Sequence, residues 1–124
     1  MTIEEFTPKH KFLICIDSDG CAVDSMTIKH KKAFGRALIE TWHLEDYKDK
    51  VMAEWERINL YSMTRGINRF LGLNMALNYI NQNIKPIDGL ADLTKFIETA
   101  KSYSNNALEE YIKSNPSKLL EECL

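Results

Sequence analysis

Apolar residues in this chain are arranged in two ways, a short continuous run followed by a long region of helical spacing. The run at residues 12–16 is bounded by polar residues, as is typical of a strand buried on both faces. From residue 26 onward, apolar positions recur about every 3.6 residues, which predicts amphipathic helices. The predicted helices span residues 26–42, 47–60 and 67–81, and three shorter ones begin near Asp88, Ser104 and Asn115.

Polar residues with capping side chains mark the expected helix starts. Asp24 or Ser25 is suited to cap the first helix, and Asp88 the fourth. Asn115 followed by Pro116 is typical of an N-cap with proline at the first helical position. The first helix is expected to bury one face made of Phe34, Ala37, Leu38, Thr41 and Trp42.

A single strand cannot form a sheet, because its backbone groups need lateral partners and both of its faces need cover. We therefore expect this chain to be the N-terminal part of a longer α/β protein, or its strand to pair with another copy in a homo-oligomer. The predicted fold is mainly α. One core β-strand and its loop occupy residues 1–25, and a helical-bundle domain occupies residues 26–124.

The composition narrows the possible partners and compartments. With 44% hydrophobic and 27% charged residues, the 124-residue chain resembles an ordinary globular domain. Its net charge of −2 gives no overall positive potential that would attract a polyanion, so nucleic acid is not an expected partner. No apolar stretch is long enough for a membrane span or a signal peptide, which makes the cytoplasm the expected location. The three cysteines include no Cys-x-x-Cys pair, and Cys15 is expected to be a strand core residue.

The residues after the apolar run carry the strongest chemical signal. Side chains alternate along an extended backbone, so Asp17 and Asp19 project to the same side. Two carboxylates so close together need a cation or a shared proton. Mg²⁺ can take one carboxylate and a backbone carbonyl and keep other positions for water and phosphate. Gly20 then allows a sharp turn.

A calcium-binding loop and a plain acidic turn are the alternative interpretations of this acidic segment. A helix-loop-helix calcium site also begins Asp-x-Asp, but here its third acidic position is Cys21, its glycine position is Ala22 and its bidentate glutamate position is Ile28. The calcium interpretation is therefore rejected. A plain acidic turn after a core strand remains as the structural alternative.

The segment is similar to the first signature of the haloacid dehalogenase superfamily, in which an apolar strand leads into Asp17-x-Asp19-Gly20 and then Asp24-Ser25 before a helix. The commoner members are Mg²⁺-dependent phosphatases with an α/β (Rossmannoid) core. One departure is Cys21, where a threonine is common. The resemblance implies that residues 26–124 form the helical cap of such an enzyme.

A second match lies in the helical region. Thr64-Arg65-Gly66-Ile67-Asn68-Arg69 resembles the cap specificity loop of the β-phosphoglucomutase and phosphoglycolate phosphatase type. The resemblance implies that Gly20, Arg65 and Arg69 bind the substrate, with the guanidinium groups meeting its anionic part. A solvated helix start is the structural alternative for the arginines, and the tract Lys29-His30-Lys31-Lys32 is interpreted as a polar helix face.

The resemblance also implies a mechanism. Asp17 would be the nucleophile that forms an aspartyl phosphate, and Asp19 the general acid and base. Mg²⁺ would bind the Asp17 carboxylate and the Asp19 main-chain carbonyl, and the substrate would be a small phosphorylated metabolite. Family enzymes also need a later Ser or Thr, a Lys or Arg and an acidic pair, so the 124 residues alone are expected to be nearly inactive. The alternative function is a non-catalytic helical oligomerisation or interaction module that retains the acidic loop as a remnant.

Overall fold

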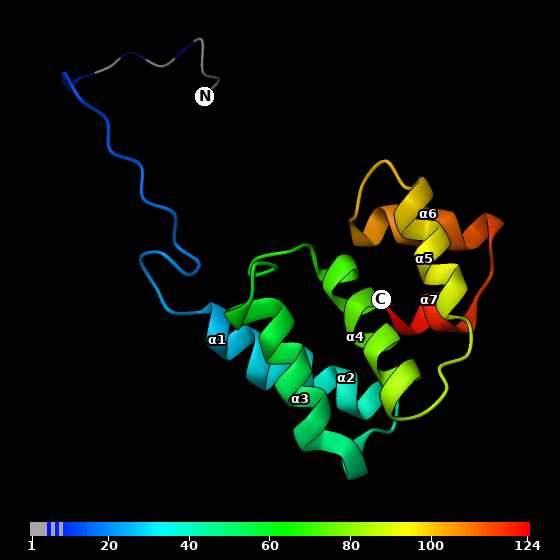
Figure 1. The fold of residues 1–124 in the computed structure, drawn as a ribbon. Helices are drawn as coiled ribbons and strands as arrows, with labels where there is room; N and C mark the ends of the chain where they lie inside the picture. Colours follow the sequence, from blue (N-terminus) through cyan, green and yellow to red (C-terminus); the bar gives the residue numbers. More distant parts are fainter. Residues whose placement is uncertain (1–4, 6, 8) are drawn as a thin grey trace.

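Helices dominate the part of the chain that the computed structural model describes, residues 5, 7 and 9–124 (Figure 1). The mainly α fold class predicted from the sequence is confirmed for these residues. The α-helices are α1 (Met26–Ile28), α2 (Gly35–Thr41), α3 (Lys48–Glu56), α4 (Arg69–Asn83), α5 (Leu90–Thr99), α6 (Asn105–Ser114) and α7 (Lys118–Glu122). Two π-helical segments, η2 (Lys29–Phe34) and η4 (Arg57–Tyr61), and one 3₁₀ segment, η3 (Glu45–Tyr47), adjoin them.

The three longer predicted helices are present, with small shifts at their ends. The first runs from α1 through η2 to the end of α2, and the second from α3 through η4. The third, α4, begins two residues later than predicted because Asn68 is its N-cap and accepts the Phe70 N–H at 2.9 Å. Helix α3 packs against α2 and α4, α4 packs against α5, and α5 packs against α7 (Figure 1).

Two of the predicted caps are wrong. Gly89, not Asp88, is the N-cap of α5, and its φ of 80° lies in the left-handed region that an aspartate rarely adopts. Asn115 closes α6 instead of opening α7, because its N–H continues the bonds to the carbonyls of Tyr111 and Ile112. Helix α7 starts after Ser117.

Two further predicted starts have different outcomes. The Ser104 hydroxyl accepts the Ala107 N–H at 3.2 Å, which confirms a helix start there. Ser25 occupies the N-cap position of α1, but its side chain caps nothing and bonds to Asp19 instead.

Aromatic side chains join the helices into one hydrophobic core. Phe96 of α5 is fully buried between Phe70 of α4, with ring centroids 5.9 Å apart, and Tyr111 of α6, at 5.2 Å. Trp55 of α3 is 2% exposed and donates its indole N–H to the His30 carbonyl oxygen at 3.0 Å. Edge-to-face packing of this kind adds to the stabilisation that burial alone provides.

The first helix buries a different face from the predicted one. Within the predicted stripe only Leu38 is fully buried, whereas Gly35 and Ile39 of α2 are buried and Phe34 is exposed. The cause is η2, where the Gly35 N–H bonds to the carbonyl of His30, five residues back. A π-turn inserts one residue and rotates the following helix, which a period of 3.6 does not anticipate.

Gly35→Ala is expected to destabilise the protein by about 1–3 kcal/mol through overpacking, although alanine is the better helix former by about 1 kcal/mol. A Cβ atom at residue 35 would lie 2.6 Å from Met52 Cε and 2.7 Å from the His30 carbonyl oxygen. The methionine can move, but the carbonyl is fixed by the helix. Urea unfolding measures the change, with Ala33→Gly, at an exposed position of η2, as the propensity control. A more stable Gly35→Ala protein would contradict this packing.

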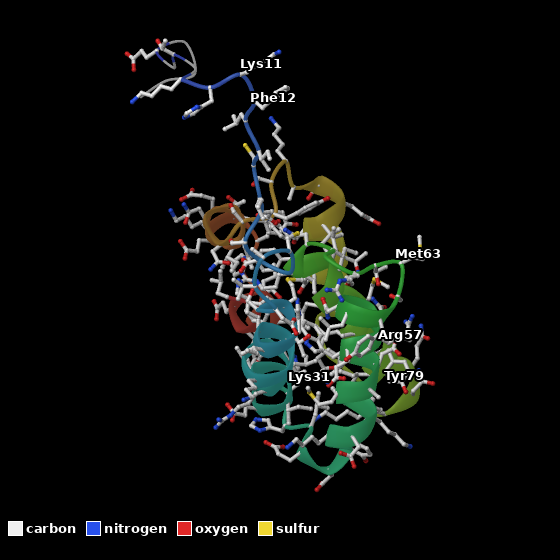
Figure 2. All side chains as sticks on the ribbon, turned by 90° about the vertical axis from the view of Figure 1, so that its left-hand side faces the viewer. Lys11, Phe12, Lys31, Arg57, Met63 and Tyr79 are labelled. Atoms are coloured by element: carbon white, nitrogen blue, oxygen red, sulfur yellow. The ribbon has the colours of Figure 1, made fainter. Side chains whose placement is uncertain are left out.

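The predicted strand at residues 12–16 is not observed in the described residues. Phe12, Leu13, Ile14 and Ile16 are between 74% and 83% exposed, and Figure 1 shows this stretch leading away from the helices. Figure 2 shows Phe12 on that stretch, apart from the helical body. The predicted core residue Cys15 is exposed as well. The physical reason is that the described part of the chain offers no neighbouring strand to pair with.

The predicted division at residue 25 falls where α1 begins. Residues 1–4, 6 and 8 of the predicted first segment lie outside the described residues. Across the described part of the chain, the helices are too short or too polar to cross a membrane.

Candidate functional site

Residues 17–25, here called the acidic loop, form a turn closed by backbone hydrogen bonds. The Ala22 N–H donates to the Asp17 carbonyl at 3.2 Å, and the Val23 N–H to the Ser18 carbonyl at 2.9 Å. The Gly20 N–H returns to the Val23 carbonyl at 2.8 Å. Gly20 has a φ of 73°, and a Cβ there would lie 2.9 Å from Met26 Cγ, so glycine is required for this shape.

The Asp19 carboxylate is held by two side chains from the start of the first helix. Ser25 Oγ donates to Asp19 Oδ1 at 2.7 Å, and Lys29 Nζ to Asp19 Oδ2 at 2.7 Å. The Lys29 hydrogen bond, the Ser25 hydrogen bond and the Lys29 charge together lower the pKa of the Asp19 carboxyl. Asp19 is therefore kept ionised, and the lysine tract predicted to be only a polar helix face contributes a contact to the loop.

Lys29→Met is expected to raise the pKa of Asp19 toward its ordinary value, because it removes the largest cause of the lowering, the Lys29 hydrogen bond. The acid titration of the Asp19 side chain, followed by carboxyl NMR, measures this change. Lys32→Met, at an exposed position of the same helix, is the matched control and is expected to leave the titration in place. An unchanged Asp19 pKa in Lys29→Met would show that the ion pair does not form in solution.

Asp17 stands in a different environment from Asp19. Its side chain is exposed, and its described side-chain contact is a weak one, from Cys21 Sγ at 4.0 Å. Among the described hydrogen bonds of the acidic loop, none is accepted by the Asp19 backbone carbonyl. The Asp17 carboxylate and this carbonyl are thus both available oxygen ligands.

A carboxylate and a backbone carbonyl are both ligand types that Mg²⁺ accepts in proteins. Mg²⁺ commonly takes one or two carboxylates from the protein and completes its shell with water and phosphate oxygens. Within the described residues there is no group of three or more His, Cys, Asp or Glu side chains placed to hold a metal. The Asp17 carboxylate and the Asp19 carbonyl are the candidate ligands that the resemblance implies for this loop, and a Mg²⁺ site there stays a prediction.

The loop between η4 and α4, residues 62–68, is here called the Arg65 loop. Thr64 Oγ1 donates to the Ile58 carbonyl at 2.6 Å and shares a 2.7 Å hydrogen bond with Ser62 Oγ. Arg65 Nη1 donates to the Leu60 carbonyl at 3.0 Å and the residue is exposed. Gly66 turns the chain with a φ of 79°. Arg65 is thus held at the end of η4, with its guanidinium accessible to solvent.

Contacts made by η2 connect the acidic loop to the Arg65 loop. Lys29 pairs with Asp19, and the Arg65 charge is close enough to help lower the pKa of His30. Lys31 Nζ lies 3.3 Å from Glu56 Oε2 and 5.9 Å from the ring centre of Tyr61. The two loops therefore meet the same helical turn at one end of the domain (Figure 1).

Arg69 makes its contacts elsewhere. Its Nη2 donates to Asn105 Oδ1 at the start of α6, and its guanidinium carbon lies 4.7 Å from the centre of the Phe70 ring. It also lines an apolar cavity of about 320 Å³ together with Trp42 and Cys123. The structure therefore groups Arg65, and not Arg69, with the helical turn that carries Lys29.

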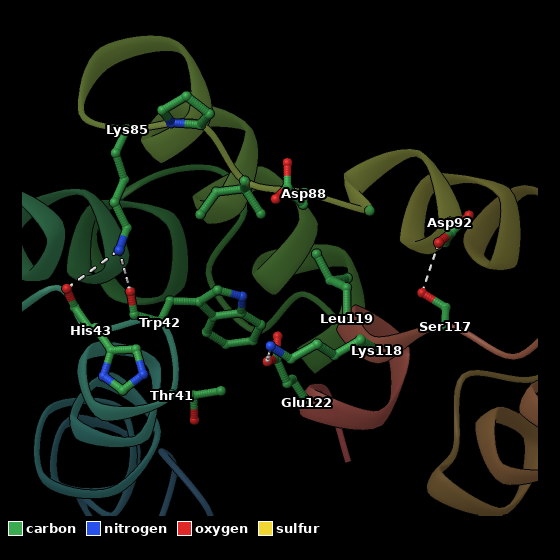
Figure 3. A pocket seen from close by; sticks show the side chains of 13 residues that line it. Thr41, Trp42, His43, Lys85, Asp88, Asp92, Ser117, Lys118, Leu119 and Glu122 are labelled. Atoms are coloured by element: carbon green, nitrogen blue, oxygen red, sulfur yellow. Dashed lines mark hydrogen bonds and ion pairs between the residues drawn. The ribbon is translucent and has the colours of Figure 1, made fainter.

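A second cavity, of about 450 Å³, lies between α2, α5 and α7 (Figure 3). Lys85 Nζ bonds the carbonyls of Trp42 at 2.6 Å and His43 at 3.4 Å, and His43 has a left-handed φ of 52°. Ser117 Oγ donates to Asp92 Oδ2 at 2.7 Å. No sequence motif joins Lys85, His43, Asp92 and Ser117, because they come from elements that lie far apart in the chain. Their polar atoms mostly bond to one another, which indicates a structural junction.

Comparisons of the chain with protein-family models, with curated proteins and with solved structures found no match.

Proposed function

We propose that this chain supplies the nucleophile loop and the helical cap of a Mg²⁺-dependent phosphatase of the haloacid dehalogenase type. The observation that carries the proposal is the difference between the two carboxylates of the acidic loop. Asp17 is exposed and free to react, whereas Asp19 is tied to Ser25 and Lys29. A closed backbone turn with a left-handed Gly20 holds both in place. A plain acidic turn does not require this arrangement.

In the proposed reaction, an Oδ atom of Asp17 forms a bond to phosphorus while the bond from phosphorus to the leaving oxygen breaks. Asp19 gives a proton to the leaving oxygen and then takes one from the water that releases phosphate from Asp17. Mg²⁺, held by the Asp17 carboxylate and the Asp19 carbonyl, would supply positive charge beside the phosphoryl oxygens.

The ion pair with Lys29 opposes the proposed role of Asp19 as a general acid. A carboxyl whose pKa is lowered carries few protons at neutral pH and is a poor general acid. Asp19 can therefore donate a proton only after Lys29 moves away from it. A substrate phosphate provides an alternative partner for the Lys29 ammonium, so substrate binding itself would free Asp19.

Arg65 is the better supported of the two candidate substrate arginines. It is exposed and lies next to the helical turn that carries Lys29. The proposed substrate is a small phosphorylated metabolite in the cytoplasm, whose anionic group meets Arg65. Arg69 is engaged with Asn105 and would need to leave that contact to bind substrate.

The resemblance also requires residues from later family motifs, namely a Ser or Thr, a Lys or Arg and an acidic pair. The 124 residues alone are therefore expected to hydrolyse phosphomonoesters very slowly. The test is Mg²⁺-dependent phosphate release from a sugar phosphate, a nucleotide and phosphoglycolate by the intact gene product. Release that stops on chelation of Mg²⁺ supports the proposal. No release from a wider panel of phosphomonoesters would contradict it.

A second candidate function is a non-catalytic oligomerisation or interaction module. The observation in its favour is the exposure of the apolar residues 12–16. This function predicts a stable oligomer in light scattering, protection of residues 12–16 from hydrogen exchange, and no dependence of either on Asp17. The phosphatase proposal predicts that Asp17 matters for metal binding.

A further inference from the structure

His30 is a buried titratable residue that the proposed phosphatase chemistry does not use. It is 8% exposed and lies in η2, next to Lys29, which pairs with Asp19 of the acidic loop. Its ring centroid is 5.6 Å from that of Phe34 and 5.9 Å from that of Trp55. Its backbone carbonyl accepts the Trp55 indole N–H at 3.0 Å. Side chain and backbone of this residue therefore both join the first helix to α3.

A positive charge on the imidazole would have neither a hydrogen-bond acceptor at Nδ1 nor an unpaired anionic neighbour to stabilise it. Its Nδ1 atom is buried and has no hydrogen-bond partner. The neighbouring charges are cationic, Lys29 on the same helix and Arg65 on the facing loop. Two acidic groups near these cations are already paired: Glu56 of α3 lies 3.3 Å from Lys31, and Asp19 of the acidic loop lies 2.7 Å from Lys29. Tyr61 of η4 also interacts with Lys31.

We infer that protonation of His30 loosens the Arg65 loop. The neutral imidazole holds η2 against α3 beside this loop. The protonated ring moves out into water, and the loop loses that support. A buried imidazolium whose Nδ1–H lacks an acceptor, between two cations, is costly. The ring reduces this cost by leaving its position between Phe34 and Trp55. The inference does not depend on the proposed phosphatase function.

The direction of the pH effect follows from the pKa of His30. Burial, the Lys29 charge and the Arg65 charge lower it below 6.5 in the folded protein. The unfolded chain then binds more protons than the folded one as pH falls through 6.5. The stability that neutral His30 provides is therefore complete above pH 6.5 and is lost as the pH falls toward the folded-state pKa. Carboxylates titrate at lower pH and give a separate contribution.

The first test uses the unmodified protein and NMR titration of its three histidines, His10, His30 and His43. The expected result is a pKa for His30 below its ordinary value of 6.5, with the amide signals of residues 62–68 shifting together with the His30 ring. A His30 pKa of 6.5 or above would overturn the inference. Amide signals of the Arg65 loop that stay unchanged through the His30 titration would also overturn the inference.

The second test separates the titration from the packing. His30→Phe keeps an aromatic ring between Phe34 and Trp55 but cannot take up a proton. We expect it to lose the fall in urea midpoint that the unmodified protein shows between pH 7.5 and 5.5, whereas the matched control His43→Gln keeps it. Trp55 fluorescence in a Trp42→Phe background reports the same transition. An equal fall in His30→Phe and in the unmodified protein would overturn the inference.

Discussion

Trp55→Ala is expected to destabilise the helical domain by about 3–5 kcal/mol, the cost usually found when a buried large aromatic side chain is truncated to alanine. Trp55 is 2% exposed and is among the largest fully enclosed side chains. It also donates to the His30 carbonyl at the π-turn of η2. Since domains of this size have about 5–15 kcal/mol of stability, the variant is expected to unfold at a clearly lower urea concentration than the unmodified protein.

Trp55→Phe is the control that separates burial from the hydrogen bond. It keeps a buried six-membered aromatic ring and loses the indole N–H together with part of the fused ring. Because the His30 carbonyl still accepts the Gly35 N–H, we expect a loss of about 1 kcal/mol from the missing hydrogen bond beyond any packing change. Urea unfolding followed by circular dichroism measures both variants. Equal stability of Trp55→Ala and the unmodified protein would contradict the packing of α3 against the first helix.

Asp17→Asn is expected to abolish Mg²⁺-dependent phosphate release by the gene product, with a fall in kcat on the order of a thousandfold or more, as when a catalytic nucleophile is removed. An amide is a poor nucleophile and a weak Mg²⁺ ligand, so one substitution removes both roles. Asp17 is exposed and lies outside the hydrophobic core, so the folded state is expected to be unaffected. Initial rates and an unfolding curve on the same preparation measure the two effects.

The matched control is Asp24→Asn in the same loop. Asp24 is exposed and has no role in the proposed chemistry, so phosphate release is expected to continue at a similar rate. Turnover retained by Asp17→Asn would remove Asp17 from the nucleophile role. Loss of turnover in both variants, with both still folded, would indicate a general effect of charge in the acidic loop.

The helices of the core could be predicted from the sequence because their signal is local. Leu73, Leu77 and Ile80 recur at helical spacing, and all are buried in α4. The π-turn of η2 could not be predicted, because the local sequence does not indicate that the His30 carbonyl also accepts the Trp55 indole N–H from another helix. Tertiary contacts of this kind override a regular period. The same turn explains why Phe34 was expected in the core but is exposed.

The candidate site was only partly predictable, for the same physical reason. The spacing predicts that Asp17 and Asp19 project to the same side, but it does not indicate that Asp19 is held by Ser25 and Lys29 while Asp17 is exposed. Lys29 reaches Asp19 across ten residues, which no helical or strand period reveals. The resemblance implies the same substrate-binding role for Arg65 and Arg69, although the two arginines contact different helices.

The central claim, that the acidic loop is a divalent-cation site prepared for a phosphoryl group, is tested most directly by an NMR titration of the 124-residue chain with Mn²⁺ as a paramagnetic substitute for Mg²⁺. The predicted result is selective broadening of the amides of Asp17, Asp19 and Gly20 at a lower Mn²⁺ concentration than those of the exposed pair Glu109 and Glu110. Excess Mg²⁺ should reverse this broadening, and Asp17→Asn should abolish it. Broadening spread evenly over the surface carboxylates, or unchanged in Asp17→Asn, would contradict the account.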